Sequence, residues 1–175
     1  MVRIFLAAIV LLFFTKDAVS QQASPRLAHT IQLKDGRTIT LTLPSSLTID
    51  IAAQGLRRIS FFAESPDHRI FVTDMYNRTD NSLGKIYILD GWNEATHSFA
   101  RIVPYLDHLR NPNSVAFYTE PARDGSPAQA WLYVALTDRL MRYKYVPGDN
   151  APTAAPEVLA RYPTLGSTTN TAAGI

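Results

Sequence analysis

Few side chains in this sequence could carry out catalysis or hold a metal. The chain has no cysteine, which excludes disulfides, thiolate metal sites, iron–sulfur clusters and thiol catalysis. No two histidines share an element with a carboxylate at metal-ligand spacing, and no nucleophile elbow, phosphate-binding loop or zincin motif is present. The sequence therefore predicts no catalytic residue and no metal ligand within this chain. The four histidines are expected at the surface: His29, His68, His97 and His108.

Composition narrows the class of protein before any element is placed. The 175 residues are 46% hydrophobic and 18% charged, which is typical of a globular chain. The 17 basic residues exceed the 15 acidic ones by a net charge of only +2. Nucleic acid is therefore not an expected partner, because binding it requires a concentrated basic face.

The first residues have the pattern of a secretory signal peptide. Arg3 precedes an apolar run at 4–14, and Ala18-Val19-Ser20 places small residues just before Gln21. The run is shorter than the roughly 20 apolar residues that cross a bilayer, although an N-terminal membrane anchor is the alternative. We expect residues 1–20 to be removed on export. The mature protein would be periplasmic or secreted, with no stable membrane span.

Short alternating segments predict an all-β fold. Asp35-Gly36 separates two alternating runs within 28–43, which predicts a hairpin whose threonines face water. A further short strand is expected at 47–51, and the best helical candidate, 103–109, is short. Eight more strands are predicted between turn signals, at 59–63, 69–73, 85–89, 98–103, 114–118, 130–135, 140–145 and 157–162.

An internal repeat favours a β-propeller over a sandwich or a barrel. The segment 58–89 resembles the segment 114–144 strand by strand, and four strands in roughly 40–55 residues make one propeller blade. Two unrelated β-meanders are the alternative. We expect a propeller fragment with about two four-stranded blades plus an N-terminal β-hairpin and closing strand. The expected segments are a signal peptide (1–20), the hairpin and propeller-closing strand (21–52), blade 1 (53–110), blade 2 (111–166) and the start of a truncated third blade (167–175).

Propeller geometry selects the residues that would line a ligand site. The mouth of a propeller is lined by the loops that enter each innermost strand and those that join the second and third strands. Arg58 and Asn113 lie at the start of innermost strands, and Asp74 and Asp138 lie at the ends of second strands. Arg58 and Asn113 are our candidate cofactor-binding residues. Alternatively, Arg58 forms an ion pair between blades, Asn113 caps a turn, and the two aspartates cap the loops that follow them.

Several motifs within residues 47–166 occur in the order found in a known family. They are Gly55-Leu56-Arg57-Arg58-Ile59, the run 65–74 (SPDHRIFVTD), Gly84-Lys85-Ile86-Tyr87, 109–117 (LRNPNSVAF), Trp131-Leu132-Tyr133-Val134-Ala135 and 142–149 (RYKYVPGD). This ordered set resembles the soluble glucose/sorbosone dehydrogenases, six-bladed β-propellers that use pyrroloquinoline quinone (PQQ). Arg57 stands where that family often has proline, and His68 replaces its usual turn glycine.

The resemblance implies a function, cofactors and partners. As the N-terminal part of such an enzyme, the chain would serve the oxidation of an aldose or sugar aldehyde, with PQQ passing electrons to an acceptor and Ca²⁺ orienting the quinone. The family's catalytic histidine would follow Gly166, but 167–175 contain none. Most PQQ and Ca²⁺ ligands would lie outside this chain, which alone we expect to be inactive. The alternatives are a non-catalytic exported propeller that binds proteins or glycans, and a lactonase-like hydrolase on the same fold.

Overall fold

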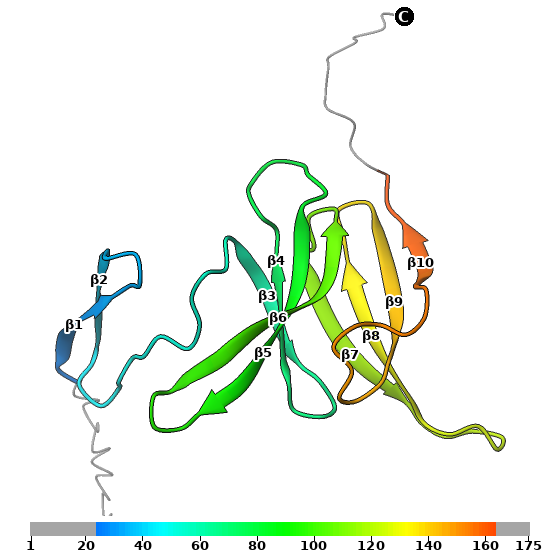
Figure 1. The fold of residues 1–175 in the computed structure, drawn as a ribbon, viewed down its shortest axis with the longest axis horizontal. Coiled ribbons are helices and arrows are strands. Elements are labelled where there is room, and N and C mark those ends of the chain that lie inside the picture. Colours follow the sequence, from blue (N-terminus) through cyan, green and yellow to red (C-terminus); the bar gives the residue numbers. More distant parts are fainter. Residues whose placement is uncertain (1–23, 164–175) are drawn as a thin grey trace, which may run out of the picture.

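The computed structural model describes residues 24–163, which contain β-strands and loops but no helix (Figure 1). The strands are β1 (Arg26–Gln32), β2 (Thr38–Pro44), β3 (Ile59–Glu64), β4 (Ile70–Asp74), β5 (Gly84–Asn93), β6 (Ser98–Leu109), β7 (Ser114–Glu120), β8 (Gln129–Ala135), β9 (Arg139–Tyr145) and β10 (Glu157–Arg161). The predicted all-β class is confirmed. The predicted signal peptide and third-blade start, 1–20 and 167–175, lie outside the described residues. Within 24–163 there is accordingly no helix that could cross a membrane.

β1 and β2 pair as the antiparallel hairpin that the Asp35-Gly36 signal predicts. Gly36 has a φ of 85°, a conformation that glycine adopts without steric cost. The register pairs Ile31 with Ile39, so the apolar side chains share one face and the threonines share the other. The apolar face is only partly covered, because Ile39 is 44% exposed and Leu41 is 40% exposed.

The strand expected at 47–51 is absent, and that prediction was wrong. Residues 47–56 have no strand assignment, and a backbone hydrogen bond from Phe99 N to Ala52 O (2.8 Å) joins them to β6. An alternating apolar run becomes a strand only where a neighbouring strand supplies ladder partners. No described strand pairs with 47–51, so the run stays irregular.

Two four-stranded antiparallel sheets follow, each a meander of consecutive strands. One has the order β3-β4-β5-β6 and the other β7-β8-β9-β10, which confirms the eight strands predicted between 59 and 162. The helical candidate 103–109 was wrong, because these residues continue β6 and pair with β5. Pairing with a distant strand here overrides a short apolar run that could suit either structure. Two sheets do not by themselves make a propeller, so the ring stays a prediction.

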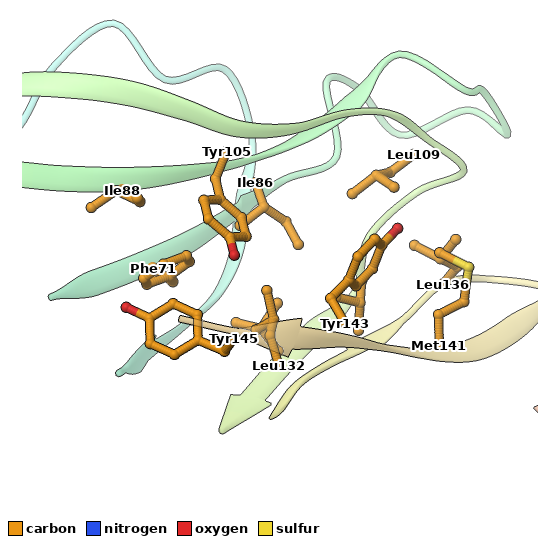
Figure 2. Close-up of a cluster of buried hydrophobic side chains, with 12 residues drawn as sticks. Phe71, Ile86, Ile88, Tyr105, Leu109, Leu132, Leu136, Met141, Tyr143 and Tyr145 are labelled. Carbon is orange, nitrogen blue, oxygen red and sulfur yellow. The ribbon is translucent and has the colours of Figure 1, made fainter. Parts of the chain in front are cut away.

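The core lies between the two sheets. Phe71 on β4 packs edge-on against Tyr105, Phe117 and Tyr145, with ring centroids 4.9, 4.9 and 5.8 Å away. Figure 2 shows Phe71, Tyr105 and Tyr145 among aliphatic side chains that come from both sheets. Burial of each such side chain stabilises the fold by roughly 1.5–3 kcal/mol, so this cluster joins the sheets into one unit.

The two sheets approach each other most closely along β3 and β7. Cα atoms of β3 and of β4 come within 8 Å of β7, whereas those of β5 and β6 come that close to no strand of the other sheet. The sheets therefore diverge away from β3 and β7. β3 and β7 begin at the same end of the pair, which we call the entry end. At the opposite end, the turn end, the turn 65–69 lies against the end of β9.

Candidate functional site

The carboxylate of Asp74 organises the segment that enters β3. Asp74 is 4% exposed and accepts hydrogen bonds from the backbone N–H groups of Arg57 (2.8 Å), Arg58 (2.9 Å) and Tyr76 (2.9 Å). Aspartate side chains commonly satisfy turn amides in this way. The Met75 N–H also donates to Arg58 O at 2.9 Å. Asp74 therefore caps the loop, which confirms the alternative that the sequence analysis gave for this residue. It also fixes the backbone at Arg57 and Arg58.

Arg58 lies half-buried at the start of β3, and its guanidinium has no acidic partner among residues 24–163. Its Nε is buried and has no hydrogen-bond partner there. A buried donor without an acceptor costs about 1–3 kcal/mol. The alternative that Arg58 forms an ion pair between the sheets is therefore not realised. The arginine retains donor capacity for an acceptor group on a ligand.

Asn113 occupies the corresponding place just before β7. Its backbone N–H donates to Ala135 O at 2.9 Å, which holds the start of β7 against the end of β8. Its side chain is exposed. Because β3 and β7 are the closest strands of the two sheets, the structure brings Arg58 and Asn113 to neighbouring strand starts at the entry end.

Asp138 belongs to an ion network that links the two sheets. Its carboxylate pairs with Arg139 (Nη2 to Oδ2, 2.8 Å) and lies 3.7 Å from Arg110 Nη1. Arg110 in turn binds Asp80 on the β4–β5 loop, with an Nε to Oδ1 distance of 2.8 Å. Hydrogen bonds from these arginines lower the pKa of Asp138 and of Asp80. Asp138 is thus occupied by arginines of its own chain rather than free for a ligand.

An amide cluster holds the β4–β5 loop, residues 75–83, against the segment between the sheets. The Asn81 side chain donates to Asn111 Oδ1 (2.8 Å), and Asn111 Nδ2 donates to Thr79 O (3.0 Å). Beside it, Gly84 lies so close to Pro112 that an added Cβ would meet Pro112 Cδ at 2.2 Å. This loop forms the large excursion at the top of Figure 1, and its contacts fix it over the entry end.

His68, His97 and His108 lie at the surface, as the sequence predicts, whereas that prediction was wrong for His29, which is half-buried on β1 with its Nε2 buried and without a hydrogen-bond partner among residues 24–163. His97 Nδ1 is 2.7 Å from Asp50 Oδ2, His68 pairs with Glu64, and His108 lies 3.7 Å from Asp107. His108 is part of β6. Within residues 24–163 no three histidine or acidic side chains are grouped as a metal would require.

The entry end can donate hydrogen bonds but offers few groups for proton transfer. The side chains there that could bind a ligand are the guanidinium groups of Arg58 and the adjacent Arg57 and the amide of Asn113. The sequence did not predict Arg57, Tyr76 or Asn111 as candidate site residues. Tyr76 and Asn111 have φ angles of 69° and 42°, and asparagine is a known occupant of this region, but a tyrosine there has no local sequence signal.

Comparison with known proteins found no relative of this chain. No protein-family model matches the chain, no curated protein matches it, and no solved structure matches its fold. The all-β class with two packed four-stranded meanders is thus established by the chain's own structure, and its function must be argued from its own residues.

Proposed function

We propose that residues 53–163 are two neighbouring blades of a β-propeller in an exported PQQ-dependent sugar dehydrogenase, with the entry end facing the cofactor. The proposed substrate is an aldose or sugar aldehyde, and the electrons pass to a separate acceptor. The proposed location, periplasmic or secreted, follows from the pattern of residues 1–20. Both the family and the function rest on the ordered motifs described above.

The arrangement of the two sheets supports the ring. Each is a four-stranded meander of consecutive strands, and they approach along β3 and β7 while diverging elsewhere. Neighbouring blades of a propeller are likewise close along their first strands, which lie nearest the axis, and farther apart along their last strands. Apolar side chains on the first strands also remain open to further packing, since Phe62 is 68% exposed and Tyr118 is 53% exposed.

The observation that carries the cofactor proposal is the unpartnered donor of Arg58. PQQ presents carboxylates and carbonyl oxygens, which are acceptors, and the guanidinium of Arg58 has no acidic partner among residues 24–163, so its terminal Nη groups, rather than the buried Nε, are the donors that a ligand could reach. Arg58 and the exposed amide of Asn113 fit such a group and would orient it between β3 and β7. When bound, PQQ supplies the two-electron acceptor for sugar oxidation. We assign no Ca²⁺ ligand among residues 24–163, where no suitable group of side chains occurs.

The test is cofactor-dependent dye reduction. The natural protein that carries these residues, incubated with PQQ and Ca²⁺, should reduce a redox dye when aldoses are added and should lose this activity without PQQ. Arg58→Gln should weaken PQQ binding by about tenfold, the effect of one lost charge-assisted bond. Arg123→Gln, at an exposed arginine of the β7–β8 loop, is the matched control. Absence of dye reduction on every aldose would refute the enzyme, and ligand binding without redox activity would instead favour the non-catalytic propeller.

A further inference from the structure

A cleft at the entry end lies on the face of the first sheet opposite the core. On β5, Ile86 and Ile88 are buried in the core between the sheets. Since side chains alternate along a strand, Lys85 and Tyr87 point to the other face. There they line a cleft of about 410 Å³, together with Arg57, Tyr76 and Asp107.

Arg57 is the group in this cleft that is open to an anion. Its guanidinium carbon lies 4.4 Å from the centroid of the Tyr76 ring, and it forms no ion pair with an acidic side chain of residues 24–163. Asp74, although it also lines the cleft, receives the backbone N–H of Arg57 rather than its guanidinium. Stacking on a ring restrains an arginine side chain and leaves its N–H edges free.

Tyr76 is held in an unusual conformation to support this arrangement. Its φ of 69° is in the left-handed region, which is unfavourable for a bulky residue and clusters at functional positions. The Asp74 carboxylate fixes that conformation by accepting the Tyr76 N–H at 2.9 Å. The strained turn therefore places an aromatic ring beneath the free guanidinium.

The rest of the lining is Leu83, the Lys85–Asp107 ion pair, Tyr87, His108 and the Asp74 carboxylate, which within the described residues bonds backbone N–H groups only. Lys85 Nζ bonds Asp107 Oδ2 at 2.8 Å, and His108 Nδ1 lies 3.7 Å from Asp107 Oδ1. Burial raises the pKa of Tyr87 above its usual value, and its hydroxyl, protonated at neutral pH in either case, can donate a hydrogen bond. Because Lys85 and Asp107 neutralise each other, Arg57 is the cation in this cleft that remains without an acidic partner among residues 24–163.

We propose that this cleft binds a sugar acid, such as a hexuronate, whose carboxylate pairs with Arg57 and whose ring and hydroxyls contact Tyr76, Tyr87 and the Lys85–Asp107 pair. Tyrosine rings offer apolar faces for the C–H groups of a sugar, and their hydroxyls exchange hydrogen bonds with sugar hydroxyls. A bare phosphate would leave these rings uncontacted. The site uses neither Arg58 nor Asn113 and does not require the quinone. Tyr87 shares its face of the sheet with Phe62, so the cleft takes a ligand only where no further blade covers that face.

The experiment is titration of the full chain with sodium D-glucuronate, followed by calorimetry and by the NMR signals of the tyrosine rings. We expect saturable binding of glucuronate, with D-glucose and acetate each at least tenfold weaker. Arg57→Gln should reduce glucuronate affinity by about tenfold, and Tyr87→Phe should reduce it less. Arg78→Gln, two positions beyond Tyr76 and exposed, should leave affinity unchanged.

Each of three results would overturn the proposal. Equal affinity for glucose would mean that no charge is recognised, and equal affinity for acetate would mean that no sugar is recognised. Binding that survives in Arg57→Gln would place the ligand elsewhere. Unfolding of that variant is checked by its melting temperature, with Arg57→Lys as the second variant, expected to keep part of the affinity. Loss of PQQ binding without any change in glucuronate binding would affect only the quinone proposal.

Discussion

At the turn end, polar side chains of both sheets bind one another, whereas at the entry end Arg57 and Arg58 pair with no acidic side chain of residues 24–163. In the turn-end cluster, Asp67 accepts hydrogen bonds from Ser65 Oγ (2.5 Å), Tyr145 OH (2.5 Å) and Gly148 N (2.8 Å). Arg69 Nη2 donates to Tyr145 OH at 2.6 Å. Arg69 Nε lies 3.0 Å from Asp67 Oδ2 but is not aligned as a hydrogen bond, so that contact is an ion pair.

The turn-end side chains use their hydrogen-bonding groups to hold the two sheets together, whereas Arg57 and Arg58 do not. A cluster whose members satisfy one another holds the turn of one sheet against the last residue of β9 and leaves little for a ligand. Unpartnered arginines contribute little to stability and keep their donors available. Arginines therefore join the sheets at both ends, through Arg69 at the turn end and Arg110 at the entry end, whereas Arg57 and Arg58 do not, and variants of the two kinds of arginine should behave differently.

The largest expected effect is at Tyr145, which belongs both to the core and to the turn-end cluster. Tyr145→Ala should lower the free energy of unfolding by about 3–5 kcal/mol, because it empties a site that is 1% exposed beside Phe71 and Phe117. Urea unfolding measures the change. Tyr145→Phe keeps the ring and should lose about 1–2 kcal/mol through the missing hydroxyl. A loss below about 1 kcal/mol for the alanine variant would show that the sheets are not joined here.

Acid should destabilise the turn end through Asp67. Burial acts to raise the pKa of Asp67, but hydrogen bonds from Ser65, Tyr145 and Gly148 and the charge of Arg69 lower it from 3.8 to about 2. A carboxyl with a lowered folded-state pKa stabilises the fold above its unfolded pKa, and this contribution is lost as the pH falls from about 4 to 2. The loss should amount to about 2 kcal/mol.

The control for this pH dependence is Asp67→Asn, because other carboxylates with lowered pKa also titrate in this range. The stability difference between the natural protein and the variant should shrink as the pH falls from 5 to 2. A difference that stays constant across this window would mean that the carboxylate charge does not hold the cluster.

At the start of β3, the stabilising group is the carboxylate of Asp74 rather than Arg57 or Arg58. Asp74→Ala removes the acceptor of three backbone N–H groups and should cost about 1–3 kcal/mol. It should also speed hydrogen exchange at Arg57, Arg58 and Tyr76, measured by NMR, while exchange at the turn end is unaffected. Uniformly faster exchange would contradict a local role.

Much of the fold was predictable from local pattern, and the site was not. Strand segments and the Asp35-Gly36 turn are set by alternation and by glycine's positive φ, which a sequence displays directly. The strand expected at 47–51 failed because pairing needs a partner that alternation cannot supply. The capping role of Asp74 could be predicted from its place at the end of a strand. The stacking of Arg57 on Tyr76 could not, because it depends on the left-handed backbone conformation of Tyr76, which the neighbouring sequence does not predict.

The smallest expected loss of stability tests the comparison most directly, by removing one arginine from each end. Arg58→Met removes an unpartnered guanidinium and should leave the free energy of unfolding unchanged or raise it by up to about 1–3 kcal/mol, because the buried Nε no longer lacks an acceptor. Arg69→Met removes a donor to Tyr145 and the charge beside Asp67, and should cost about 1–3 kcal/mol. Urea unfolding of both variants under the same conditions decides the matter. Equal costs would mean that Arg58 is bound within the fold, and its availability to a ligand would then have no basis.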